Sequence, residues 1–125
     1  MADQKTVTGF ISKAGERISG VGDYTVVKSG TGLYNVVFRP PFAAPPVVVS
    51  TQVFPNNIAD GGGSTRDNAV IVGITDQQVR IKVGDGNGSA QDRDFTFIAM
   101  GIPLTGTALA DWEAEHGHEA AAHEG

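Results

Sequence analysis

Apolar and polar residues alternate along most of the chain, and glycine or proline interrupts the alternation about every ten positions. An alternation of period two places every second side chain on the same face of a β-strand. The pattern is clearest where Val79, Ile81 and Val83 alternate with two basic residues. The first hundred residues are therefore predicted to form strands rather than helices.

Short strand-like segments recur along the chain, with turn residues between them. No helical pattern that could connect parallel strands precedes residue 107, so the strands are predicted to pair antiparallel. The expected fold class is all-β, a single antiparallel β-sandwich of about six to seven strands. The predicted strands are residues 7–11, 24–28, 33–39, 47–54, 68–74, 79–83 and 93–101.

A proline-rich segment, residues 39–46, separates the third and fourth of these strands. Proline lacks the backbone donor that a helix or a central strand needs, so this segment is a connection. Phe42 lies within it and is expected to plug one end of the core. The following run, Val47 to Val49, is apolar at every position, which predicts a strand buried on both faces, with another subunit as a candidate neighbour.

The net charge of the chain is concentrated near its C-terminus. The formal net charge is −5, from 9 Lys plus Arg and 14 Asp plus Glu. Residues 1–110 contain all 9 basic residues and 9 of the acidic ones, so the excess acidic residues lie beyond them. The predicted organisation is a β-sandwich domain over residues 1–106 and an acidic, His-containing tail over residues 107–125. Its alanine and glutamate content favours a short helix, and a disordered tail is the alternative.

The composition argues against several function classes. The body has no net charge and no basic stripe, so no nucleic-acid partner is expected. No apolar run approaches the ~20 residues of a membrane span, so no membrane insertion is expected. The chain has no cysteine, and its 3 histidines all lie in the tail. Because the body therefore lacks an imidazole beside a nucleophile, we expect no enzyme and no catalytic residues.

Two acidic patterns resemble known chemistry without completing it. Asp85, Asn87 and Ser89 begin like an EF-hand calcium loop, but the glycine and the bidentate glutamate that should follow are missing. Asp92 and Asp94 are two positions apart and would face one side of a strand, which makes them the best candidate pair for glycosidase chemistry. A charged rim is the simpler interpretation. We expect no cofactor and no metal, with a weak calcium site as the alternative.

The tail offers one further metal hypothesis. His116, His118 and His123 are close in sequence, and clustered histidines bind divalent metals. A solvated acidic tail is the simpler interpretation. Trp112 and Leu109 are the apolar residues that would anchor the tail on the body or on a neighbouring subunit.

Two long polar loops, residues 56–68 and 84–94, are the candidate ligand-binding surface. Binding residues commonly lie on the loops of a rigid β scaffold. Hydrogen-bonding side chains are dense in both loops, which suits a shallow carbohydrate site. The same residue types also form turns, so a purely structural role is the alternative. The candidate glycan-binding residues are Asn57, Arg66, Asp67, Asp85, Asn87, Asp92, Arg93 and Asp94.

Three stretches together resemble small β-sandwich domains of bacterial and phage proteins. Residues 29–38 resemble the GTGxYxVxF hairpin of these domains, residues 41–49 their Phe-Pro step, and residues 92–101 their closing DRxFxFIAxG strand. The layout is similar to the H-type lectin fold and to the receptor-binding tips of phage tail fibres. It spans about residues 9–102 and is more specific for fold than for ligand.

The resemblance implies a homotrimer, with glycan sites near the subunit boundaries and with Val47 to Val49 or the closing strand at the interface. The aromatic and histidine sugar contacts of animal H-type lectins have no counterpart in the body, so galactosamine-type specificity is not implied.

The expected function is a non-catalytic virion or phage-like particle protein: a decoration, tail or fibre component with a structural or attachment role and candidate glycan binding. The alternative is a free-standing bacterial lectin that binds cell-surface carbohydrate. The expected partners are further copies of the chain, other virion proteins or cell-surface glycans. The expected location is a virion or other extracellular particle, reached without a Sec signal, and otherwise the cytoplasm.

Overall fold

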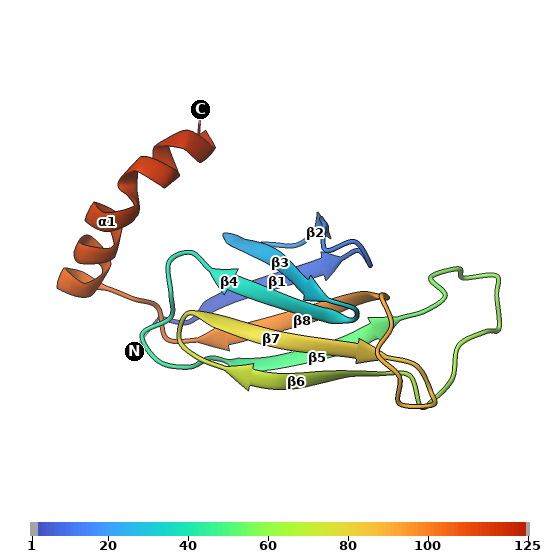
Figure 1. Cartoon of the computed structure of the whole chain (residues 1–125). Helices are drawn as coiled ribbons and strands as arrows, with labels where there is room; N and C mark the ends of the chain where they lie inside the picture. The colour runs from blue at the N-terminus through green and yellow to red at the C-terminus, as the bar shows by residue number, and fades with distance from the viewer. Residues whose placement is uncertain (1–2, 125) are drawn as a thin grey trace.

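The computed structural model describes the backbone of residues 3–124 and the side chains of residues 3–116. Within this part of the chain, eight strands form two sheets and one helix follows them (Figure 1). The elements are β1 (Lys5–Ile11), β2 (Arg17–Ser19), β3 (Tyr24–Gly30), β4 (Leu33–Phe38), β5 (Val47–Val53), β6 (Asn68–Ile74), β7 (Gln78–Gly84), β8 (Asp94–Gly101) and α1 (Gly106–Glu124).

The strands of both sheets pair antiparallel. Sheet A has the order β2-β1-β8-β5, and sheet B has the order β3-β4-β7-β6. In sheet A, β8 lies between β1 and β5, so Phe97 is opposite Gly9 on one side and Ser50 on the other. The prediction of an all-β fold with antiparallel strands is confirmed. The structure has eight strands because Arg17–Ser19 pairs with β1 as a short edge strand, which the sequence pattern does not mark.

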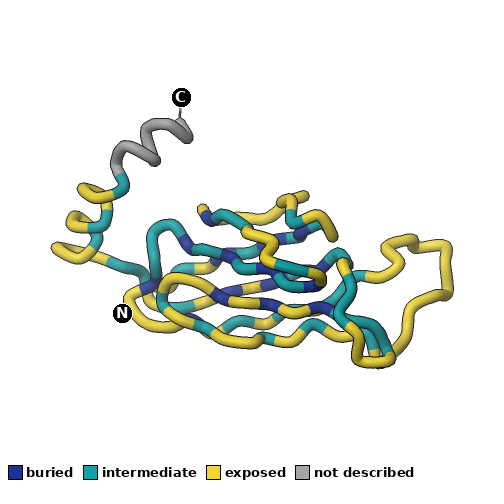
Figure 2. Tube along the Cα trace, in the orientation of Figure 1, coloured by how far each residue is buried: buried dark blue, intermediate teal, exposed yellow. Residues whose placement is uncertain are grey.

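The core lies between the two sheets, where the alternating side chains of their inner faces meet (Figure 2). Tyr24 of β3 lies edge-on to Phe97 of β8 with ring centroids 5.4 Å apart, and Tyr34 of β4 lies 4.9 Å from Phe95. The alternating positions of the fourth, seventh and eighth strands are therefore buried, as the pattern predicts. The buried residues are Val7, Ile11, Tyr24, Tyr34, Val36, Phe38, Phe42, Val79, Ile81, Val83, Phe95, Phe97 and Ala99.

Phe42 closes one end of the core, which confirms its predicted role. Its side chain is fully buried, and its ring lies edge-on to Phe38 with the centroids 4.9 Å apart. The Lys5 ammonium lies 4.9 Å from the centroid of the Phe42 ring and donates a hydrogen bond of 2.7 Å to the Pro40 carbonyl. The proline-rich connection is thereby held against β1 while its aromatic ring fills the space between the sheets.

The outer face of sheet A is uncovered within the single chain. Val47 is 72% exposed and Val49 is 66% exposed, while Val48 alone of the three packs against the core. The prediction that this run is buried on both faces is therefore wrong for one copy of the chain. The physical reason is that the described chain packs only the inner face of sheet A against a second layer, so the outward side chains of β5 have no covering element. Ile98 and Met100 of the adjacent strand β8 extend the same exposed apolar surface.

The tail forms the helix α1, which is the helical alternative of the prediction. Leu109, Trp112 and His116 are its half-buried positions, and their spacing of three and four residues places them on one face. The Trp112 and His116 rings stack with centroids 4.4 Å apart. Both residues line a cleft with Arg39 and the end of β4. The helix α1 lies at the end of the sheets opposite to the long polar loops (Figure 1).

The tail's metal hypothesis falls partly beyond what the structure describes. The side chains of His118 and His123 lie outside the described residues, so their relation to His116 stays a prediction. Among the side chains that are described, no three metal-ligating groups come together. The described helix is also not long and apolar enough to cross a membrane.

Candidate ligand-binding loops

The two polar loops singled out by the sequence meet at one end of the sheets. The β5–β6 loop and the β7–β8 loop both leave this end, and the first extends furthest from the body (Figure 1). The sequence analysis places eight candidate ligand-binding residues there. Their hydrogen bonds decide which of them remain available to a ligand.

Arg93 joins the two loops through a largely buried ion pair. Its guanidinium carbon lies 3.4 Å from the centroid of the Phe54 ring, and Nη1 donates a hydrogen bond of 3.0 Å to Gln52 Oε1. Nη1 also lies 3.6 Å from Asp67 Oδ2, with the two side chains only 14% and 11% exposed. Asp67 in turn accepts a hydrogen bond of 2.8 Å from the Ser64 amide. Arg93 and Asp67 thus hold the β5–β6 loop against β5.

Asp85 organises the β7–β8 loop around its own carboxylate. Its Oδ1 accepts hydrogen bonds from the Asn87 amide at 2.9 Å and the Ser89 amide at 3.0 Å, and its Oδ2 accepts one from Gln91 at 3.2 Å. The backbone hydrogen bonds, from Ser89 and then Asn87, lower the pKa of Asp85. The residues that resemble a calcium loop therefore form a turn in which the carboxylate already has partners from the protein.

Asp92 and Asp94 hold two different parts of the chain. Asp92 Oδ1 accepts a hydrogen bond of 2.8 Å from the Gly32 amide and lies 3.0 Å from the Lys28 ammonium. The Gly32 amide, followed by Lys28, lowers the pKa of the Asp92 carboxyl. Asp94 instead accepts hydrogen bonds from the Lys13 amide and the Asn56 side chain. Asp92 precedes β8 instead of lying on it, so the two carboxylates do not share the predicted strand face.

The three candidates not yet described are Asn57, Arg66 and Asn87. Asn57 Oδ1 accepts a hydrogen bond of 3.1 Å from the Ala59 amide two positions on, which stabilises its own turn. The side chains of Arg66 and Asn87 make no hydrogen bond or ion pair with the residues that the structure describes. The polar loops are thus built largely from residues that hold them in shape, and Arg66 is the cation among them that stays free.

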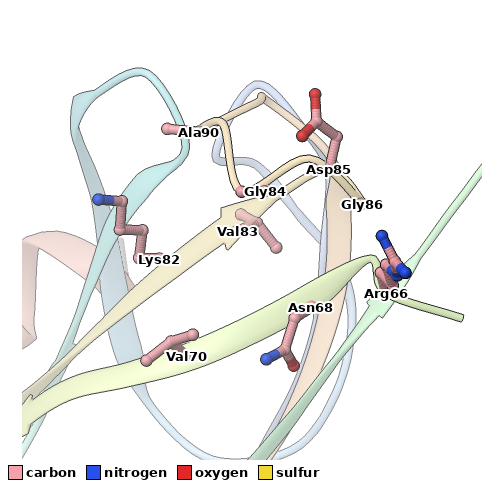
Figure 3. A pocket seen from close by; sticks show the side chains of 10 residues that line it. Arg66, Asn68, Val70, Lys82, Val83, Gly84, Asp85, Gly86 and Ala90 are labelled. Atoms are coloured by element: carbon pink, nitrogen blue, oxygen red, sulfur yellow. The ribbon is translucent and has the colours of Figure 1, made fainter. Parts of the chain in front are cut away.

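Two clefts flank the β5–β6 loop. One, of about 360 Å³, contains Gln52, Phe54 and Asp67 together with the glycine-rich part of the loop. The other, of about 300 Å³, lies between the outer side of β6 and β7 and the β7–β8 loop, and contains Arg66 and Asp85 (Figure 3). The adjacent residues Arg66 and Asp67 therefore line different clefts, and the candidate residues do not form one continuous site.

Sequence reasoning missed Lys82 and Val70, which line the second cleft with Arg66. The alternation of residues 79–83 does indicate that Lys82 points away from the core. It gives no indication that Val70 is opposite Lys82, because that pairing depends on the register of β6 and β7. Sequence reasoning also missed Phe54, whose ring packs against the Arg93 guanidinium and lines the first cleft.

Tyr34 lies beneath this end of the molecule and makes stability sensitive to high pH. Its hydroxyl donates a hydrogen bond of 2.6 Å to the Lys13 carbonyl. Burial, aided by the negative charge of Asp92, raises the pKa of Tyr34 from 10.0 to about 12. Because the unfolded state loses this proton first, the free energy of unfolding should fall by about 2 kcal/mol between pH 10 and pH 12.

Urea unfolding at pH 8, 10 and 11.5 measures this loss. Tyr34→Phe removes the titrating group, and we expect it to lower stability by about 1 kcal/mol at pH 8 through the lost hydrogen bond. Above pH 10 the variant should lose less stability than the wild type. Parallel pH dependence in the two proteins would show that Tyr34 isn't the group responsible.

Comparison of the whole chain with protein-family models, with curated proteins and with solved structures finds no match.

Proposed function

We propose that the chain is a non-catalytic attachment domain that assembles as a homotrimer on a virion or phage-like particle, with a β-sandwich of the H-type lectin kind. The observation that carries the proposal is the largely apolar outer face of sheet A. Three cross-strand rows form its uncharged part: Thr6–Met100–Val47, Thr8–Ile98–Val49 and Phe10–Thr96–Thr51. The next row, Val53–Asp94, places a carboxylate at the loop end of the face. Monomeric proteins rarely leave a contiguous apolar surface of this kind uncovered.

The two sheets differ sharply on their outer sides. The three rows of sheet A contain no ionisable residue. On sheet B, the corresponding central strand β7 presents Arg80 and Lys82. Burying a charge without a partner is costly, so sheet B is suited to water and sheet A to a second protein surface. A second copy of the chain fits this requirement, because the same three rows of its sheet A would bring no charge into the contact.

The position of β5 supports the same assignment. As the edge strand of sheet A it has one side without a hydrogen-bonded neighbour strand in that sheet. Because β6 of the other sheet lies beside this edge, a second chain would contact β5 through its outer face, where Val47 and Val49 are exposed. The polar loops and α1 lie at opposite ends of the sheets (Figure 1). In an attachment protein the loops would then face the target, and the acidic helix would face the particle.

Native mass spectrometry of the purified chain at several concentrations tests the proposal, and we expect a trimer. Val49→Glu should convert it to a monomer, because symmetry would bring several unpaired carboxylates into the interface. Val72→Glu is the matched control: it is the same substitution on an outer strand of sheet B, where Val72 is 54% exposed compared with 66% for Val49. The control should remain trimeric.

Two results would contradict the proposal. A wild-type chain that stays monomeric at micromolar and higher concentrations would remove the trimer. A trimer that withstands Val49→Glu but dissociates with Val72→Glu would move the interface to sheet B. Circular dichroism of both variants establishes that each retains its β-structure, so that a change in mass reports assembly and not unfolding.

A further inference from the structure

The cleft on the outer side of β6 and β7 combines an apolar floor with basic residues at its rim. Val70 of β6 and Ala90 of the β7–β8 loop supply apolar side chains to the lining, whereas the side chain of Val83 is fully buried in the core and is not accessible from the cleft. Arg66 and Lys82 stand on opposite sides of this lining (Figure 3). The cleft has a volume of about 300 Å³, which is at the lower end of the range for small-molecule sites.

The lining of this cleft carries two positive charges, on Arg66 and Lys82, and one negative charge, on Asp85, so positive charge is in excess. Neither the Arg66 guanidinium nor the Lys82 ammonium has a hydrogen bond or ion pair with the described part of the protein. Asp85 is the one carboxylate of the lining, and its oxygens accept hydrogen bonds from Asn87, Ser89 and Gln91. Its side chain also points away from Val70 and Asn68 (Figure 3). An anion entering the cleft would meet two cations that lack protein partners.

Glycine allows the two loops to form this cleft at close range. A Cβ on Gly86 would lie 2.8 Å from Ser64 Oγ and 3.3 Å from Arg66 Cβ, so a larger residue would push the loops apart. Ser64 Oγ accepts a hydrogen bond of 3.2 Å from the Arg66 amide, and the Ser64 amide is held by Asp67. The backbone of Arg66 is therefore fixed at the cleft, while its guanidinium has no partner in the described part of the protein that a ligand would have to displace.

We propose that this cleft binds a carboxylate-bearing sugar, with the carboxylate on Arg66 and the less polar face of the sugar ring on Val70 and Ala90. The planar guanidinium offers two parallel N–H donors, which match the two oxygens of a carboxylate. Lys82 adds positive potential at the opposite rim and attracts the anion. This proposal specifies the class of ligand for the attachment role. The choice of a sugar, rather than another carboxylate, rests on that proposed function.

Titration of the ¹⁵N-labelled full chain, followed by NMR, tests the inference. The probes are glucuronic acid and N-acetylneuraminic acid, with galactose as the neutral control and sodium acetate as the carboxylate without a ring. We expect both acidic sugars to shift the amides of Gly84, Gly86 and Gly88. Galactose should leave these amides unchanged, and acetate should bind at least about tenfold more weakly than the sugars because it lacks contact with the floor.

Two arginine variants separate a defined site from general positive charge. Arg66→Gln should weaken binding of glucuronic acid at least about tenfold, since it removes a charge-assisted contact. Arg80→Gln removes the same charge from β7 outside this cleft, where Arg80 Nε donates to Asn35 Oδ1, and it should leave binding unchanged.

Gly86→Ala should weaken binding by displacing the Arg66 loop, whereas Gly61→Ala, with open space around its Cβ, should not.

Several outcomes would overturn the inference. Equal losses in Arg66→Gln and Arg80→Gln would show a diffuse electrostatic effect. Equal affinity for acetate and for the acidic sugars would overturn the assignment to a sugar, and no shift with either acid would overturn the site. The proposed trimer fails separately, because it is tested on sheet A by mass spectrometry, and this cleft lies on sheet B and its loops.

Discussion

Replacing Phe97 with alanine should lower the free energy of unfolding by about 3–5 kcal/mol, because it removes a large aromatic side chain from the middle of the core. Phe97 is 2% exposed and belongs to β8, which pairs with a strand on each side. Its ring meets Tyr24 of the opposite sheet edge-on, so the same ring contributes to both sheets. Domains of this size have only about 5–15 kcal/mol to lose.

Chemical denaturation with urea, followed by circular dichroism, measures this loss. The matched surface control is Ile58→Ala, because Ile58 is fully exposed on the β5–β6 loop and should change stability by less than about 0.5 kcal/mol. A loss below about 1.5 kcal/mol for Phe97→Ala would mean that the core can collapse around the missing ring, contrary to the packing described here.

The second large effect is expected at Gly9, where an alanine should cost about 2–3 kcal/mol of stability. A Cβ at this position would lie 2.5 Å from Phe97 Cε1 and closer still to the Tyr24 hydroxyl oxygen. Tyr24 is itself restrained, since its hydroxyl donates a hydrogen bond of 3.1 Å to the Thr8 carbonyl. The glycine in β1 therefore provides the space that two aromatic rings occupy.

A double-mutant cycle with Phe97→Leu identifies this contact as the cause. The smaller leucine should leave room for the new methyl group, so Gly9→Ala should cost less in the Phe97→Leu background than in the wild type. Gly73→Ala is the matched control in a strand, because nothing lies within 4 Å of its Cβ position, and it should be close to neutral. Identical costs of Gly9→Ala in both backgrounds would contradict the steric explanation.

In the proposed attachment protein, the two sheets and the two ends of the molecule would have different roles. Sheet A has an apolar outer face suited to another copy of the chain, and sheet B carries Arg80 and Lys82 on its outer face. The loops with their two clefts lie at one end, and α1 lies at the other (Figure 1). A particle-bound attachment protein needs this separation, because assembly, anchoring and target binding must occur at the same time.

Most of the candidate residues lie in loops, as the sequence predicts. The sequence does not indicate the role of each side chain. Asp92 is sixty positions from Gly32, and Asp94 is eighty-one positions from Lys13, yet each accepts a short hydrogen bond from that distant amide. An aspartate can stabilise its own turn, hold a loop to a distant segment or remain available to a ligand, and its distant partners decide which of these it does. Arg93 has such partners in Gln52 and Asp67, whereas the side chain of Arg66 has none among the described residues.

The sequence by itself determined seven of the eight described strands, their inward faces, the antiparallel all-β class and the plug at Phe42, because period-two alternation and proline act through local backbone geometry. Only the tertiary structure decided that Val47 and Val49 are exposed, and that Arg66 and Lys82 line one cleft. Exposure and pairing depend on strand order and register, which bring together segments that no local pattern relates.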